Sequence, residues 1–279
     1  MHVFSQTTAL LAACAMGGVR AASPTSGVME LDLAFPRNQT YKPAARLPIV
    51  FGYQNPELAT ALNARVSFVV WNLDDMRNSV VTSSFDLGQA ANLSSRDPFL
   101  QYGYFPGFEA EGRWLLTWTV GWDNCTEDSL ELTNTGKRIT HQTTTQSVRF
   151  ATKDSAPETD LAAATDNKDC PQEMGLAFDV TATLKVPSWA KGEDWSGGDQ
   201  CAKVAESMPK PSPCRVQIDA AAASSMAASM TAKACAHKDV APPKGVECPP
   251  DEKSSAQQLV VTGMACLAAA VGAFGFVLM

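Results

Sequence analysis

Apolar and polar residues alternate along much of this sequence, and this period of two limits the fold more than any other feature. In RWLLTWTVGWDNC (113–125) the alternation places five large apolar residues on one side: Trp114, Leu116, Trp118, Val120 and Trp122. Successive side chains of a β-strand point to opposite faces of the sheet, so this run predicts a strand with one face in the core. We therefore interpret its tryptophans as core residues and not as a stripe that stacks on sugars.

The alternation recurs at short spacing, and turn-forming residues separate the runs. Strand-like segments cover residues 29–35, 47–53, 64–73, 79–88, 113–125, 139–152 and 175–186. In the first, Glu30 and Asp32 fall on the side away from the apolar residues. In 64–73, apolar residues on both sides predict that both faces are covered. This pattern predicts a mainly β chain, an antiparallel β-sandwich that is immunoglobulin-like in its general architecture.

The C-terminal part adds a predicted helix to these strands. Residues 219–236 read DAAAASSMAASMTAKACA, which predicts a helix with Asp219 as its N-cap. Residues 153–169 and 188–200 predict surface loops. The segment YGYFPGF (102–108) predicts an aromatic turn that closes one end of the sandwich, with a ligand-binding lip as the alternative.

Eight cysteines are present, and two of them lie in the end segments of the sequence. The other six are an even set, which agrees with disulfide formation in a secreted protein: Cys125, Cys170, Cys201, Cys214, Cys235 and Cys248. We predict three disulfides that brace the C-terminal helical part, and all fifteen pairings of six cysteines remain open. A zinc site is the alternative, but no two cysteines have the close spacing that such sites use.

The two ends resemble targeting segments. Residues 1–21 are predicted to be a signal peptide, because an apolar stretch is followed by small residues. Residues 259–279 carry no charge, and Ser254 and Ser255 precede them. We predict 251–279 to be a short stalk and a glycosylphosphatidylinositol (GPI) signal with the lipid added at one of these serines, and a retained membrane span is the alternative. Residues 22–250 are predicted to be a single β-sandwich domain whose Cys-rich part is about 170–248.

Sequons and charge agree with an extracellular setting. N-glycosylation is predicted at Asn38, Asn92 and Asn124, each of which has Thr or Ser two residues later. The formal net charge is −7, and no basic cluster is present, so nucleic acid is not an expected partner. The expected partners are the membrane, through the C-terminal anchor or span, and cell-wall polysaccharide.

No set of residues predicts an enzyme, a cofactor or a metal site. Paired acids such as Glu109 and Glu111 lie in turn-like contexts where solvated carboxylates are usual. The sequence contains no Gly-x-Ser-x-Gly motif whose serine His141 could activate as a general base. Trp189 and Trp195 lie in a Gly-rich, charged loop and are candidate platforms for a glycan, with packing on the Cys-rich part as the alternative.

The chain resembles a family of secreted fungal proteins that share a domain of unknown function, DUF7136. Four stretches carry the resemblance: ELDLAFPRNQTY, LPIVFGYQNPELATALNARVSFVVWN, EGRWLLTWTVGWDNC and PCRVQIDAAAASSMAASMTAKAC. The resemblance implies a fungal secreted or wall-associated setting and supplies no catalytic residue.

These observations favour a glycosylated, non-enzymatic protein at the extracellular face of the plasma membrane or in the cell wall, reached through the secretory pathway. Its expected role is structural or one of interaction. A carbohydrate-binding module for wall polysaccharide is the alternative, and a wall-remodelling hydrolase that uses carboxylates such as Glu109 and Glu111 is the third hypothesis.

Overall fold

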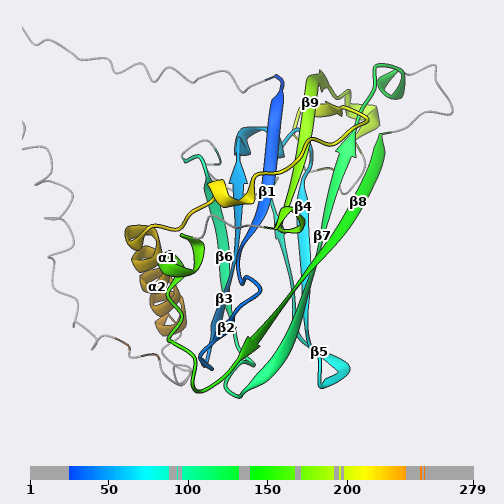
Figure 1. The fold of residues 1–279 in the computed structure, drawn as a ribbon. Coiled ribbons are helices and arrows are strands. Elements are labelled where there is room, and N and C mark those ends of the chain that lie inside the picture. The colour runs from blue at the N-terminus through cyan, green and yellow to red at the C-terminus, as the bar shows by residue number, and fades with distance from the viewer. Residues whose placement is uncertain are drawn as a thin grey trace, which may run out of the picture. The chain divides into compact units, whose positions relative to one another are not determined.

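The structure is a computed structural model that describes residues 25–87, 93, 96–131, 139–166, 171–191, 195, 198–236, 246 and 248. The predicted signal peptide, the predicted GPI signal with Ser254 and Ser255, and Asn92 and Cys170 lie outside the described residues. The chain divides into two compact units, Met1–Met226 and Ala227–Met279. The first unit contains two five-stranded sheets (Figure 1).

Sheet A is antiparallel throughout, and sheet B is antiparallel except for one short parallel pair. In sheet A the strand order is β10 (Gln200–Val204), β9 (Gly175–Lys185), β1 (Gly27–Phe35), β3 (Leu47–Gln54), β6 (Phe99–Phe105). In sheet B it is β2 (Thr40–Tyr41), β8 (Thr140–Thr152), β7 (Gly112–Asn124), β4 (Arg65–Asn72), β5 (Asp75–Asp86). Strand β2 pairs in parallel with β8.

Aromatic side chains fill the space between the two sheets. Phe51 of β3 meets Trp118 of β7 with ring centroids 5.6 Å apart, and Trp122 meets Phe178 of β9 at 4.9 Å. The predicted core tryptophans Trp114, Trp118 and Trp122 are 4%, 1% and 5% exposed. The predicted fold class, a mainly β sandwich, is therefore confirmed, since its core forms where the alternating faces of both sheets meet.

Several local expectations differ from the structure. Residues 102–105 belong to strand β6 and not to a turn, because FLQYGYF pairs in register with Leu47–Tyr53 of β3. The predicted loop 153–169 contains the short helix α1 (Leu161–Thr165), whose N-cap Asp160 accepts hydrogen bonds from the amides of Ala162 and Ala163. The short strands β2 and β10 have too few residues to show a period.

The predicted C-terminal helix is present as α2 (Ala220–Cys235). The amide of Ala222 donates to Asp219 Oδ1 at 2.7 Å, which confirms Asp219 as the N-cap. Met226 is buried in the first unit. In the second unit, Cys235 is disulfide-bonded to Cys248 with their Cα atoms 5.7 Å apart. Within the described residues, no helix has the length and apolarity needed to cross a bilayer.

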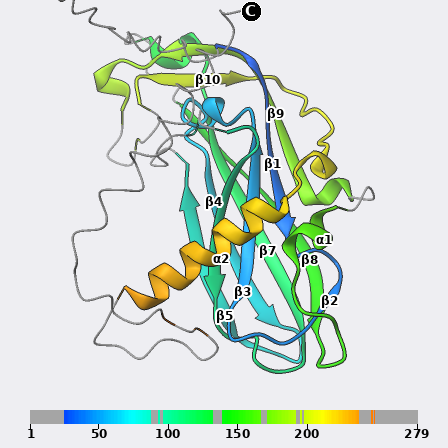
Figure 2. The same ribbon diagram turned by 90° about the vertical axis from the view of Figure 1, so that its left-hand side faces the viewer.

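The chain covers the outer face of its own sheet A. Residues 205–219, here called the covering segment, run from β10 to the start of α2 (Figure 2). Val216 of this segment is fully buried against Gly52 of β3, where an added Cβ would lie 2.3 Å from Val216 Cγ1. Glycine at position 52 is therefore what lets the covering segment approach the sheet. The amide of Ile218 donates to Thr165 Oγ1 of α1 at 2.9 Å.

Two acidic residues are buried beneath the covering segment. Glu30 and Asp32 do lie on the side of β1 away from the sandwich core, as predicted, yet they are only 5% and 0% exposed. The Glu30 carboxylate accepts a hydrogen bond from the amide of Ser212 in the covering segment. Asp32 Oδ2 accepts one from Gln54 Nε2 at 3.0 Å, while no donor faces its Oδ1 among the described residues.

Burial raises the pKa of Asp32 to about 8, and the neighbouring Glu30 raises it further through its charge and a side-chain hydrogen bond, against the opposing effects of Gln54 and Arg37. A protonated Asp32 is a hydrogen-bond donor, which a carboxylate is not. Asp32 is therefore protonated and neutral at neutral pH.

We predict that the wild-type protein loses stability as the pH rises from about 4 to 8, and that Asp32→Asn abolishes this loss. The folded protein keeps a proton on Asp32 that the unfolded chain loses near pH 4, so Asp32 lowers the unfolding free energy between about pH 4 and 8, by up to about 1.4 kcal/mol per pH unit. Asparagine stays neutral and still offers an acceptor and a donor. The stability of Asp32→Asn relative to the wild type should rise across this range in denaturant titrations.

Asp75→Asn is the control for this prediction. Hydrogen bonds from Arg77 hold the pKa of the exposed Asp75 carboxylate below its usual range. Asp75→Asn therefore loses a small stabilisation that is constant above about pH 4 and vanishes at acidic pH, so its stability should run parallel to that of the wild type between pH 4 and 8. Parallel pH curves for Asp32→Asn and the wild type between pH 4 and 8 would contradict the raised pKa of Asp32.

Candidate functional site

Disulfide bonds are present, as predicted, and one of them closes an end of the sandwich. Cys125, directly after β7, is bonded to Cys201 of β10, with Cα atoms 6.0 Å apart and a sequence separation of 76. Both cysteines are fully buried, and they form a small second cluster with Val186. Cys214 is also disulfide-bonded. The bond between Cys125 and Cys201 ties sheet B to sheet A, because β7 and β10 belong to different sheets.

Two of the three predicted sequons lie in the described part of the chain. Asn38 is exposed just before β2. Asn124 is half-buried beside Cys125, and its Oδ1 accepts a hydrogen bond from the amide of Val204 at 2.9 Å. An N-linked glycan is attached through the other amide atom, Nδ2, so this bond leaves the attachment atom available.

The two tryptophans proposed as glycan platforms have different surroundings. Trp195 packs against the cluster of Cys125, Cys201 and Val186, and its Nε1 donates to the carbonyl of Gly198 at 2.8 Å. Trp189, in the short 3₁₀ helix Ser188–Ala190, is 50% exposed. Of the two, Trp189 is therefore the one whose ring is accessible to a ligand.

The acidic residues considered for hydrolysis do not form a carboxylate pair around a cleft. Glu109 and Glu111 are exposed, and Glu111 Oε1 accepts a hydrogen bond from the amide of Asp154 at 2.8 Å. Asp74 is ion-paired with Arg113, and Glu127 with Lys203 at 2.9 Å. These acids act as ordinary surface ion pairs and loop contacts.

A histidine and an aspartate that sequence reasoning treated separately meet at the end of β7 and β8. Asp123 faces His141 in the strand register, and Asp123 Oδ1 lies 2.9 Å from His141 Nδ1. Asp123 Oδ2 accepts a hydrogen bond from Asn63 Nδ2 at 2.7 Å. The side chains of His141 and Asp123 are 56% and 8% exposed, so a buried carboxylate orients an exposed imidazole.

This pair lacks a nucleophile to activate. A Ser, Thr or Cys nucleophile has to lie within hydrogen-bonding distance of its histidine base. Within the described residues, the imidazole of His141 hydrogen-bonds Asp123 and no hydroxyl or thiol. The same part of the chain holds no group of three or more His, Cys, Asp and Glu side chains that would suit a metal ion. The hydrogen bond between Asp123 and His141 therefore fixes the orientation of the imidazole at the edge of sheet B.

The outer face of sheet B, here called the open face, contrasts with the covered face of sheet A. On strands β4, β7 and β8 several of its outward positions carry hydroxyl side chains. We call six of them the hydroxyl cluster: Ser67, Thr117, Thr119, Thr143, Thr145 and Ser147. All six are exposed or half-buried. Thr119 Oγ1 and Thr145 Oγ1 lie 2.8 Å apart across β7 and β8, which shows that both hydroxyls are on this face.

Beside the hydroxyl cluster the open face carries an apolar patch. Trp71 of β4 lies opposite Leu115 of β7 in the register, and Val69 is two residues away on the same face. All three are half-buried. The expectation that both faces of 64–73 are covered is therefore wrong for the outer face, where Val69 and Trp71 keep part of their surface in solvent.

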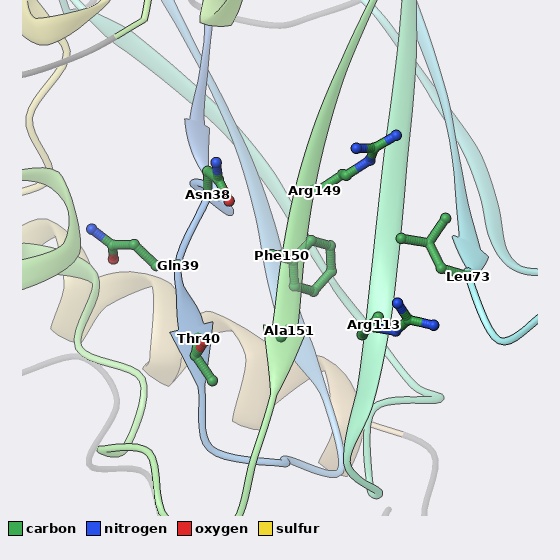
Figure 3. A pocket seen from close by; sticks show the side chains of 8 residues that line it. All are labelled: Asn38, Gln39, Thr40, Leu73, Arg113, Arg149, Phe150 and Ala151. Carbon is green, nitrogen blue, oxygen red and sulfur yellow. The ribbon is translucent and has the colours of Figure 1, made fainter.

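A hollow of about 550 Å³ lies at the end of the open face beside β2. The sequon Asn38-Gln39-Thr40 borders it on one side, and Leu73, Arg113 and Arg149 line the other (Figure 3). Arg149 is exposed and has no acidic partner among the described residues, whereas Arg113 pairs with Asp74. The predicted glycan at Asn38 would thus begin at the margin of the open face.

The fold and this surface define a disulfide-braced β-sandwich in which one sheet is covered by its own chain and the other presents an open, hydroxyl-bearing face. The model of the family described as "Domain of unknown function (DUF7136)" matches residues 24–248, and the chain belongs to this family. A search of curated proteins found none that matches.

We predict that the bond between Cys125 and Cys201 stabilises the protein more than the bond between Cys235 and Cys248. The first closes a loop of 76 residues and the second a loop of 13. The chain-entropy model gives about 4–5 kcal/mol for the longer loop and about 3 kcal/mol for the shorter. The contribution of each bond to the unfolding free energy can be measured by guanidinium unfolding of two double variants. These are Cys125→Ala with Cys201→Ala and Cys235→Ala with Cys248→Ala. A larger loss from the second pair would contradict the assigned role of the first.

Proposed function

We propose that this protein is a glycosylated, non-enzymatic cell-surface protein with a structural or interaction role at the membrane or cell wall. It is exported with removal of residues 1–21 and tethered by a GPI-type signal in 251–279. Its open face is the surface that meets a partner. Support for export comes from the apolar segment 9–19, from the disulfides and from the sequons at Asn38 and Asn124.

The observation that carries this proposal is the difference between the two outer faces. On sheet A, even charged residues such as Glu30 and Asp32 are buried by the covering segment. On sheet B, Trp71, Leu115 and the hydroxyl cluster keep exposed surface. The outer face of sheet A is covered by the chain itself, whereas the outer face of sheet B is exposed and partly apolar. An exposed, partly apolar surface is available to bind a partner, which supports an interaction role.

Carbohydrate binding through Trp189 is a second candidate, and one observation favours it. Trp189 is the most exposed aromatic side chain among the large hydrophobic residues of the described chain, at 50%. An exposed indole ring is a suitable platform for the apolar face of a sugar. A wall-remodelling hydrolase using Glu109 and Glu111 is a weaker candidate, since Glu111 already caps the backbone of Asp154.

We predict that phosphatidylinositol-specific phospholipase C releases the mature, processed chain from the surface of cells that produce it. The enzyme cuts the lipid of a GPI anchor but leaves a protein span in the bilayer. Release should be measured by immunoblot of the medium and washed membranes, and mass spectrometry of the released C-terminal peptide should show a remnant on Ser254 or Ser255.

Leu267→Arg provides the control for the anchor. A charge in the middle of the apolar stretch 259–279 disrupts the hydrophobic signal while leaving the sandwich unchanged. That variant should appear in the medium or inside the cell without any phospholipase treatment. Membrane association of the wild type that persists after phospholipase would instead support a retained span, and recovery from the cytosol would overturn the proposed function.

A further inference from the structure

The charges of the open face are nearly balanced by pairing within the protein. Arg65 lies 3.8 Å from Asp86 and Arg113 is paired with Asp74, while the Asp123 carboxylate is only 8% exposed and lies against His141. Arg149 is the remaining cation on this face in the described part of the chain. Binding to polyanions depends on several unpaired Lys or Arg side chains. The open face therefore suits a partner with little or no charge.

The hydroxyl cluster gives this neutral surface many hydrogen-bonding groups. Each hydroxyl has one donor and two acceptor positions, so the bond between Thr119 and Thr145 leaves both side chains able to bond a ligand. Because β4, β7 and β8 are adjacent, the cluster forms a grid with about 4.8 Å between strands and about 6.7 Å along each strand. A partner that matches this grid needs hydroxyl groups repeated along an extended chain.

Trp71 adds an apolar contact at the border of the grid. It lies directly opposite Leu115, next to Val69 on β4, so its ring is part of a patch that remains half-exposed. Sugar rings combine hydroxyl groups at their edge with C–H groups on their face, and aromatic rings stack on such faces. Hydroxyls beside one aromatic platform are therefore the combination that a chain of neutral sugars requires.

We infer that the open face binds a neutral, extended polysaccharide, with Trp71 stacked on a sugar ring and the hydroxyl cluster hydrogen-bonded to neighbouring sugars. This inference rests on the proposed function, and it names the partner class for the face that the proposed function assigns to interaction. It places the contact on β4, β7 and β8 and not at Trp189. Arg149, at the end of the same face, is available as a donor to sugar hydroxyls.

The test is depletion of the purified full chain, in its glycosylated form, from solution by insoluble β-glucan and insoluble chitin. The wild type should be depleted by at least one of these polymers. Trp71→Ala should weaken binding about tenfold, the size expected for one well-placed aromatic contact. Thr119→Val combined with Thr145→Val should also weaken it, since valine keeps the shape and strand preference of threonine without the hydroxyl.

Trp189→Ala is the matched control for loss of an exposed indole ring, and its binding should equal that of the wild type. Thermal unfolding of every variant identifies any loss that comes from misfolding. If Trp71→Ala does not fold, the threonine variants, which change only hydroxyl groups, still decide the question.

Several results would overturn the inference. These are no depletion of the folded wild type by either polymer, or unchanged binding by both open-face variants. A loss confined to Trp189→Ala would move the site to that residue, and elution by dextran sulfate at low salt but not by soluble neutral glucan would indicate an anion site. Dimers that the open-face variants dissociate would make a second copy the occupant. None of these results changes release by phospholipase, so failure of this inference remains distinguishable from failure of the proposed function.

Discussion

Contact between the covering segment and sheet A is the constraint on which the rest of this structure depends. Val216 reaches the sheet only because position 52 is glycine, and Ser212 is held by the carboxylate of Glu30. A carboxylate buried without such a partner is strongly destabilising, so these contacts stabilise the sheet and the segment together. The raised pKa of Asp32 follows from the same burial, and it makes the stability of the protein depend on pH.

The outer face of sheet A is covered by the chain, whereas the outer face of sheet B is exposed. The contacts that stabilise the protein and the surface that can bind a partner therefore lie on different sheets. Sheet A carries the buried contacts of Glu30 and Asp32, and the bond between Cys125 and Cys201 joins it to sheet B. The outward side chains of sheet B therefore do not have to pack in a core. They include threonine and serine residues, with Trp71 and Leu115 beside them. Such a surface favours a flat, neutral partner rich in hydroxyl groups, because its own charges are largely paired.

The sequence predicted the strands and the core well, because alternation reports directly which side of a strand is apolar. Trp114, Trp118 and Trp122 were assigned to the core on that basis, and they are buried there. Alternation does not show what lies over the opposite side, which is why the burial of Glu30 and Asp32 was missed. Asp123 and His141 were also missed as a pair, since they are brought together by the register of β7 and β8.

Hydroxyl-radical footprinting of the full chain with and without a soluble neutral oligosaccharide tests the central claim most directly. Our account predicts that in the free protein Trp71 and Leu115 are oxidised while Val216 and Val50 are not, because the outer face of sheet B meets solvent and these two valines are fully buried. It predicts that the oligosaccharide protects Trp71 and Leu115 and leaves Trp189 unchanged. Oxidation of Val216 in the free chain, or protection confined to Trp189, would contradict it.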